Sequence, residues 1–326
     1  MRRDGLLYHC THAKSGPKGT MMSVYTPLNH SQLAAILDGY GYQLVNYQAA
    51  SHGIENSTFL IEALNDQQQP CPLVLTVFES LDRATLTPYL VLLEHLAAQA
   101  LPVPAPLPDG QGNDQISVAG KPAVLMPRLH GEHDFAVDLD RCRQVGALLA
   151  RLHRCDPAPL TPLPSERQRL QQLAPQIRRL PAGQQDTAHK LLRDWQRQPA
   201  GHTLIHADLF RDNLLWQGGQ ISALLDFYNA CLDHPEYDLA VTLNDWCVDT
   251  DGRPVPEREN ALLDAYREQG GQVDADRLLE ALAVAALRFW LSRLAGPVSE
   301  DSEGQGSKDP EEFARIFAHR IMHLAS

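Results

Sequence analysis

The chain has 326 residues, of which 44% are hydrophobic and 21% charged, and its formal net charge is −12. This length predicts two lobes rather than one simple core, and the ordinary composition excludes disorder of the chain as a whole. The acidic balance opposes binding to a phosphate backbone, so we expect no nucleic-acid partner.

The cysteines and the apolar runs limit the compartment. Six cysteines occur without a Cys-x-x-Cys pair or a zinc-like spacing, which favours reduced thiols in a cytoplasmic protein. No apolar run approaches the ~18 residues of a membrane span, so we expect no membrane partner. The N-terminus lacks the apolar core of a secretory signal. We expect residues 1–21 to be a disordered extension and the folded part to begin near Met22.

The first part of the chain alternates between helical periodicity and short β-branched runs, with Gly and Pro at the turns. This pattern predicts a small lobe built around an antiparallel sheet. In chain order, the expected elements are a helix over 29–41, a strand–turn–strand unit over 46–64, a strand over 72–80, a helix over 87–100 and a hairpin over 115–127.

The second part is dominated by helical periodicity. We expect two short strands within 203–231, helical pieces over 165–198, and longer helices over 139–155, 237–249, 258–270, 274–296 and 310–325. The sequence therefore predicts an α+β fold of two lobes. The small antiparallel β N-lobe is expected over 22–129, and the mostly helical C-lobe over 130–326.

The stretch Thr203–Cys231 carries ionisable groups inside apolar runs. His206, Asp208 and Asn213 form the pattern H-x-D-x-x-x-x-N, and Asp226 ends the strand I-S-A-L-L-D-F. A buried ionised carboxylate is costly unless a cation or hydrogen-bond donors meet it, and converging oxygen ligands suit Mg²⁺. The alternative interpretation is a turn in which Asp208 and Asn213 cap backbone groups.

This order of catalytic loop, hairpin and strand-terminal Asp resembles the protein-kinase-like fold. Within that fold, the segments H-A-D-L-F-R-D-N, L-D-F-Y-N-A-C and Y-D-L-A resemble the aminoglycoside phosphotransferase/choline kinase group. The runs M-S-V-Y-T-P-L, H-G-I-E-N-S-T-F-L-I-E and Y-D-L-A-V-T-L-N-D-W-C are similar to the bacterial homoserine kinases of this group, and the similarity extends from about residue 22 to the end. The resemblance implies a nucleotide-binding N-lobe and a catalytic, substrate-binding C-lobe, with ATP and Mg²⁺.

The resemblance also implies residue roles. Asp208 is expected to be the catalytic base that accepts the proton of the substrate hydroxyl. Asn213 and Asp226 are expected to be metal ligands facing the nucleotide phosphates. His206 and Asp238 are expected to support the shape of the loop.

The expected phosphate site departs from the protein-kinase pattern. Thr76 stands where a protein kinase has a Lys for the α- and β-phosphates. Either Arg83 or another cation replaces this Lys, or the metal and backbone donors suffice. The turn at Gly53 and Asn56 is not G-x-G-x-x-G, and we expect its backbone N–H groups and Asn56 to approach the phosphates.

The adenine is expected at the break over 125–131, beside Met126. Pro127 has no N–H, so the expected backbone donor is Leu129 or a neighbour. A plain interlobe linker is the alternative interpretation.

The expected substrate, homoserine, carries an ammonium, a carboxylate and a hydroxyl. Arg288, together with Arg293, is the candidate for the carboxylate, and Asp245 for the ammonium. Tyr228 and Asn229, just past Asp226, are expected to line the same pocket. The alternative is an internal Arg–Asp salt bridge or a surface-facing arginine. For Arg211, an acidic neighbour and the transferred phosphate are both open as partners.

We therefore expect an ATP-dependent enzyme that phosphorylates the hydroxyl of L-homoserine to O-phospho-L-homoserine in threonine biosynthesis. One alternative is a phosphotransferase of the same fold acting on choline, an aminoglycoside or a sugar. The other is a nucleotide-binding pseudokinase that serves as an interaction module. The absence of the Lys favours this alternative. The complete set of Asp208, Asn213 and Asp226 opposes it. Monomer and homodimer are both compatible with the sequence.

Overall fold

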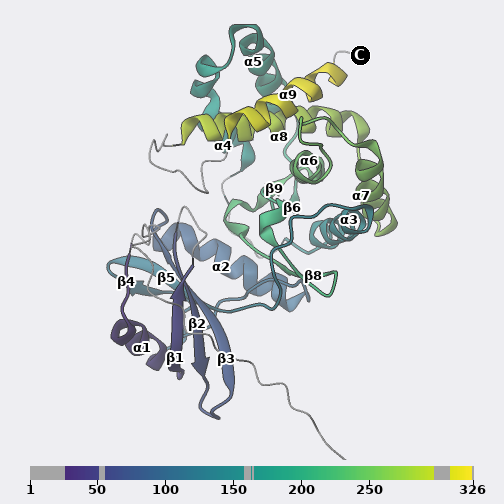
Figure 1. Cartoon of the computed structure of the whole chain (residues 1–326). Helices are drawn as coiled ribbons and strands as arrows, with labels where there is room; N and C mark the ends of the chain where they lie inside the picture. Colours follow the sequence, from purple (N-terminus) through teal and green to yellow (C-terminus); the bar gives the residue numbers. More distant parts are fainter. Residues whose placement is uncertain (1–25, 51–55, 158–162, 164, 297–308, 325–326) are drawn as a thin grey trace, which may run out of the picture.

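The computed structural model describes residues 26–50, 56–157, 163, 165–296 and 309–324 (Figure 1). The predicted N-terminal extension, residues 1–21, and Gly53 lie outside the described residues. Figure 1 shows a sheet-containing part and a mostly helical part joined after strand β5. This arrangement confirms the predicted α+β class with a small antiparallel sheet.

The sheet has five antiparallel strands in the order β1-β2-β3-β5-β4. Along β3, Leu73, Leu75 and Val77 are buried and alternate with less buried residues, as period-2 side chains of a pleated strand must. The strand bounds are β1 Gln43–Ala49, β2 Asn56–Leu64, β3 Pro70–Phe78, β4 Ile116–Val118 and β5 Lys121–Pro127.

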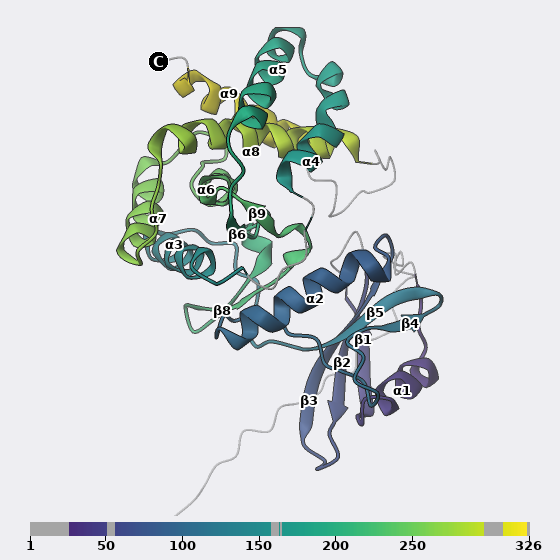
Figure 2. The ribbon, with the colours of Figure 1, turned by 180° about the vertical axis from the view of Figure 1, so that it is seen from behind.

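Two helices cover opposite faces of this sheet (Figures 1 and 2). Helix α1, His30–Asp38, is capped by Asn29 and packs its buried leucines against the face of Leu73. Helix α2, Arg83–Ala98, packs on the other face and belongs to the core of the helical part. It begins four residues before the predicted start, because the side chain of Asp82 accepts a hydrogen bond from the N–H of Thr85.

The helical part is organised around α8, which is buried along most of its length. It packs against α6 on one side and α9 on another. The helix bounds are α3 Leu139–His153, α4 Glu166–Leu173, α5 Ala182–Arg197, α6 Pro235–Trp246, α7 Pro256–Glu268, α8 Ala275–Ala295 and α9 Pro310–Leu324. Among the described helices, none has the length and apolarity needed to cross a membrane.

The stretch after α5 contains four short strands, and the expectation of two was wrong. Strand β6, Thr203–Ile205, pairs with β9, Cys231–Asp233, and β7, Leu214–Gln217, pairs with β8, Gln220–Leu224. Strands of three residues are too short to reveal an alternation in sequence. The two loops that carry the motif residues connect β6 to β7 and β8 to β9.

Candidate active site

The loop after β6 is anchored by a carboxylate on α6. The side chain of Asp238 is fully buried and accepts hydrogen bonds from the N–H groups of His206 and Ala207, each at 2.8 Å. His153 on α3 contacts the same carboxylate at 3.0 Å. These bonds hold Ala207 at a φ of 63°, a left-handed conformation that a side chain disfavours. Asp238 therefore fixes the backbone immediately before Asp208.

A second carboxylate on α6 holds the other end of this loop. Asp245 lies two helical turns after Asp238 and accepts three hydrogen bonds from Arg211, from its N–H, Nε and Nη2. Burial raises the pKa of Asp245, and Arg211 opposes that rise. Arg211 engages both carboxylate oxygens of Asp245, so its partner in this structure is an acidic neighbour. The role of Asp245 toward the substrate ammonium stays a prediction.

Between these anchors the motif residues converge. The Asn213 side chain donates its Nδ2 hydrogen to the carbonyl oxygen of Asp208 at 2.7 Å. The backbone carbonyl of Asn213 accepts from the N–H of Leu225 at 2.9 Å, which brings the following Asp226 beside the loop. Asp226 is exposed and has a φ of 62°. The Oδ1 of Asn213 and the carboxylate of Asp226 are hard oxygen donors, and they fit a Mg²⁺ ion that takes its remaining ligands from phosphate and water.

His206 is a buried part of this loop rather than a solvent-facing group. Its Nε2 contacts the carbonyl oxygen of Leu225 at 2.8 Å, and its ring lies 4.6 Å from the ring of Phe227. This contact ties the loop after β6 to the end of β8. A role for His206 in supporting the loop stays a prediction.

Of the predicted phosphate-binding residues that the structure describes, Asn56 begins β2 and Thr76 lies within β3. Thr76 pairs with Thr58 and Val124 across β2, β3 and β5, on the face that α2 covers. The Asn56 side chain accepts a hydrogen bond from the N–H of Glu79 at 3.3 Å. Arg83 donates to the carbonyl oxygen of Gln115 at 2.9 Å, and Lys121 forms an ion pair with Glu79.

The predicted adenine site comprises the last residues of β5 and the residues that follow this strand. Met126 is buried and pairs with Val74, and Leu129 is half-buried. The N–H of Arg128 donates to the carbonyl oxygen of Pro72 at 2.9 Å. Leu129 is therefore the first residue beyond the sheet whose backbone can serve as the expected donor.

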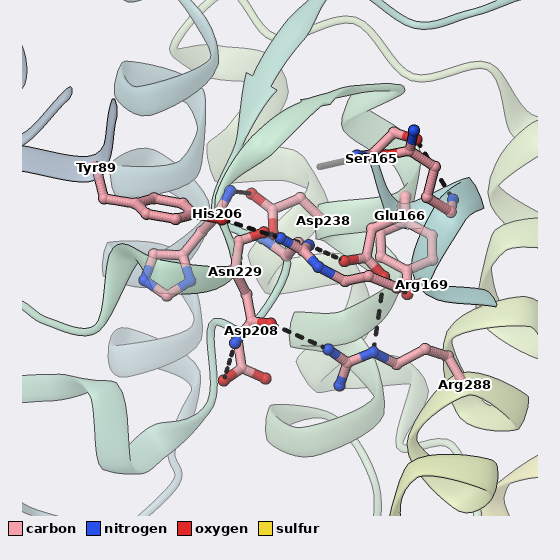
Figure 3. A network of polar contacts seen from close by, with 12 residues as sticks. Tyr89, Ser165, Glu166, Arg169, His206, Asp208, Asn229, Asp238 and Arg288 are labelled. Carbon is pink, nitrogen blue, oxygen red and sulfur yellow. Dashed lines mark hydrogen bonds and ion pairs between the residues drawn. The ribbon is translucent and has the colours of Figure 1, made fainter. Parts of the chain in front are cut away.

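A polar network lies beside Asp208 (Figure 3). The Nδ2 of Asn229 is 3.3 Å from the Oδ2 of Asp208, and the Oδ1 of Asn229 accepts from the Nη2 of Arg288 at 3.3 Å. The Nε of Arg288 is 3.6 Å from the Oε2 of Glu166, which is fully buried. The network thus links the motif loop to helices α8 and α4.

Arg169 continues the network toward an open cavity. It forms an ion pair with Glu166, donates to the carbonyl oxygen of Asn229 at 2.6 Å and contacts the hydroxyl of Tyr89 at 3.4 Å. A cavity of about 740 Å³ between α2 and α4 is lined by Arg169, Tyr89 and Tyr228 among others. Tyr228 stacks edge-on against Phe78 and Tyr89, so it joins α2 and the sheet to the loop after β8.

The structure separates the two predicted carboxylate-binding arginines. Arg288 lies in the network beside Asp208, whereas Arg293 forms an ion pair with Glu312 of α9 at 2.6 Å. Sequence reasoning missed Glu166 and Arg169, because α4 has a polar sequence that suggests a surface helix. The sequence feature that indicates this helix is the capping box formed by Ser165, just before the helix, and Gln168 within it.

Comparison with known proteins gives the same fold and a family. Residues 46–271 match the family model described as "Phosphotransferase enzyme family". The homoserine kinase of Pseudomonas aeruginosa (strain LESB58) is 37% identical over 92% of this chain and 96% of its own length. That of Polaromonas naphthalenivorans (strain CJ2) is 35% identical over 93% of this chain and 99% of its own.

Solved structures of lower identity share the fold. The amicoumacin kinase hAmiN is 15% identical, with a TM-score of 0.62 over 90% of this chain and 92% of that protein. A choline/ethanolamine kinase family protein from Mesorhizobium loti is 16% identical, with a TM-score of 0.59 over 91% of this chain and 93% of its own. Together with the similarity over nearly the whole length to the curated relatives, these matches show that the chain belongs to the phosphotransferase enzyme family and, within it, to the homoserine kinases.

Proposed function

We propose that this protein transfers the γ-phosphoryl group of ATP to the hydroxyl of L-homoserine, which gives O-phospho-L-homoserine for threonine biosynthesis. The observation that carries the proposal is the similarity to homoserine kinases over 92% of the chain. The geometry supports it, because a complete motif loop lies beside a buried network of two arginines and a glutamate. A charged network of this kind suits a small zwitterion.

In this proposal Asp208 orients the substrate hydroxyl and accepts its proton as the oxygen attacks the γ-phosphorus. The bond between the γ-phosphorus and the bridging oxygen breaks, and ADP leaves with the electron pair. Asn229 supports Asp208, because its Nδ2 lies 3.3 Å from the Oδ2 of that carboxylate. His206 and Asp238 keep the loop in shape through their contacts with Leu225 and the loop backbone.

Asn213 and Asp226 hold Mg²⁺ in this proposal, and the ion when bound neutralises phosphate charge. The Nδ2 of Asn213 donates a hydrogen bond to the carbonyl oxygen of Asp208. The Oδ1 of Asn213 therefore points away from that carbonyl and can serve as a metal ligand. No cluster of three or more His, Cys, Asp or Glu side chains suited to a metal occurs among the residues that the structure describes. A site built from one amide, one carboxylate and phosphate oxygens fits that finding.

The nucleotide lies between the sheet and the motif loop in this proposal. We assign phosphate binding to Gly53, Asn56 and Thr76, and adenine binding to Met126 and Leu129. The ion pairs and hydrogen bonds of Arg83 and Lys121 direct both side chains to Gln115 and Glu79. Metal and backbone donors therefore carry most of the charge compensation that a Lys supplies in protein kinases.

Three further assignments complete the proposal. The N-lobe spans 22–129 and binds the nucleotide, and the C-lobe spans 130–326 and binds the substrate. The five cysteines that the structure describes are free thiols, which supports a cytoplasmic location. The net charge of −12 supports a small-molecule substrate rather than a nucleic-acid partner.

A coupled ADP-release assay with Mg²⁺-ATP tests the proposal by comparing L-homoserine with choline, kanamycin and L-serine. Turnover with homoserine alone, abolished by Asp208→Asn, is the expected result. Turnover with another alcohol would retain the chemistry and refute the substrate. Saturable ATP binding without turnover on any of them would favour a pseudokinase instead.

A further inference from the structure

A pair of arginines from different helices meets at one buried carboxylate. Arg169 of α4 pairs with the Oε1 of Glu166, and the Nε of Arg288 of α8 lies 3.6 Å from its Oε2. The Oε2 also accepts a hydrogen bond from the hydroxyl of Tyr237 at 2.9 Å. Both carboxylate oxygens of Glu166 are therefore contacted by protein groups. This residue positions the two arginines and is not a partner for a substrate ammonium.

Glu166 does not satisfy all the hydrogen-bond donors of the two arginines. Two guanidinium groups share one carboxylate, and a guanidinium has five N–H donors. The Nε of Arg288 has no hydrogen-bond partner among the described residues, although the side chain is only 10% exposed. Burial lowers the pKa of Arg288, but Glu166, Tyr237 and Asp208 more than offset this effect, so the pKa is raised and the group stays charged. A substrate carboxylate would supply a hydrogen-bond acceptor to guanidinium donors that the single carboxylate of Glu166 does not satisfy.

The position of the pair suits a short amino acid. Arg288 is separated from Asp208 by a single amide side chain, that of Asn229, which contacts both. Arg169 contacts the backbone of the same Asn229 and lines the cavity between α2 and α4. Figure 3 shows the guanidinium groups of both arginines directed toward this residue. A four-carbon substrate with its hydroxyl at Asp208 extends its carboxylate toward this pair.

We propose that Arg169 and Arg288, braced by Glu166, bind the carboxylate of the amino-acid substrate, and that Arg293 does not. This inference rests on the proposed function and adds the residues that select an α-carboxylate. Glu166 is a positioning residue, because it acts through the arginines. Alcohols without a carboxylate bind more weakly than homoserine, since they make no contact with the two guanidinium groups.

Calorimetric titration of L-homoserine and of 3-amino-1-propanol, which lacks the carboxylate, into the full chain tests the proposal. Arg169→Ala and Arg288→Ala are each expected to weaken homoserine binding by about 10- to 100-fold, the range for losing a hydrogen bond to a charged group. Binding of 3-amino-1-propanol and the KM for ATP are expected to stay at the wild-type values. Glu166→Gln is expected to raise the KM for homoserine without changing the KM for ATP.

Arg277→Ala is the matched control, because Arg277 lies on the same helix α8. This arginine pairs with Glu236 and Asp274 rather than with Glu166. Arg169→Lys keeps the charge of a half-buried side chain and is expected to recover part of the affinity, even if Arg288→Ala does not fold. Unchanged homoserine binding in both Ala variants, or equal losses for the two ligands, would overturn the proposal. A wild-type protein that does not phosphorylate homoserine would refute the proposed function instead.

Discussion

Asp238 offers a test of how strongly one buried carboxylate sets the active loop. In Asp238→Asn, one carboxylate oxygen that accepts a backbone N–H becomes an amide NH₂, which faces that donor. A hydrogen bond to a charged group contributes about 1.5–3 kcal/mol. The variant loses one such bond and weakens those to the second N–H and to His153. We therefore expect the free energy of unfolding to fall by about 3 kcal/mol.

The same substitution is expected to lower kcat about 100-fold, because the two N–H groups belong to His206 and Ala207, immediately before Asp208. Urea denaturation followed by tryptophan fluorescence measures the stability, and the ADP-release assay measures kcat. Asp194→Asn on the surface of α5 is the control and should leave both unchanged. Wild-type stability and kcat in Asp238→Asn would refute the argument.

The pH dependence of stability follows from the same carboxylate. Burial raises the pKa of Asp238, but the hydrogen bond and charge of His153 and the other partners outweigh burial, so the pKa lies below its usual value. A depressed folded-state pKa gives stability that is present above the unfolded pKa, about 3.9 for Asp, and lost as pH falls through the folded pKa. The stability difference between wild type and Asp238→Asn should therefore shrink as pH falls below about 4. A difference that grows in acid would contradict this sign.

Three further predictions concern the rest of the site. A double-mutant cycle with Arg211→Ala and Asp245→Ala should give a coupling energy of about 2 kcal/mol in urea denaturation; no coupling would contradict the pairing. Asp226→Asn and removal of divalent cations with EDTA should each abolish turnover while the unfolding midpoint stays unchanged, and activity retained under both conditions would exclude the metal role. Tyr228→Ala should destabilise the protein more than Tyr228→Phe in thermal denaturation, because its ring packs on Phe78 and Tyr89; equal losses would point to the hydroxyl.

The sequence determined the features that depend on short-range pattern. The periodicity of 237–249 and 274–296 predicted α6 and α8, because buried helices of this length show their apolar residues clearly. The spacing of Asp208, Asn213 and Asp226 identified the motif, since its residues lie on two loops joined by one hairpin. The β6–β9 pairing was missed, because each strand has three residues.

Tertiary structure decided which charges meet. Asp245 and Arg211 are 34 positions apart in sequence, and their pairing depends on how α6 packs against the loop. Arg288 and Arg293 looked equivalent within one apolar run, but α8 directs the first toward Asp208 and the second toward Glu312 of α9. Glu166 and Arg169 sit on a helix with a polar sequence, and tertiary packing, including that against α8, buries Glu166 and half-buries Arg169. Burial and long-range contacts determine these partners, and the local periodicity of the sequence predicts neither.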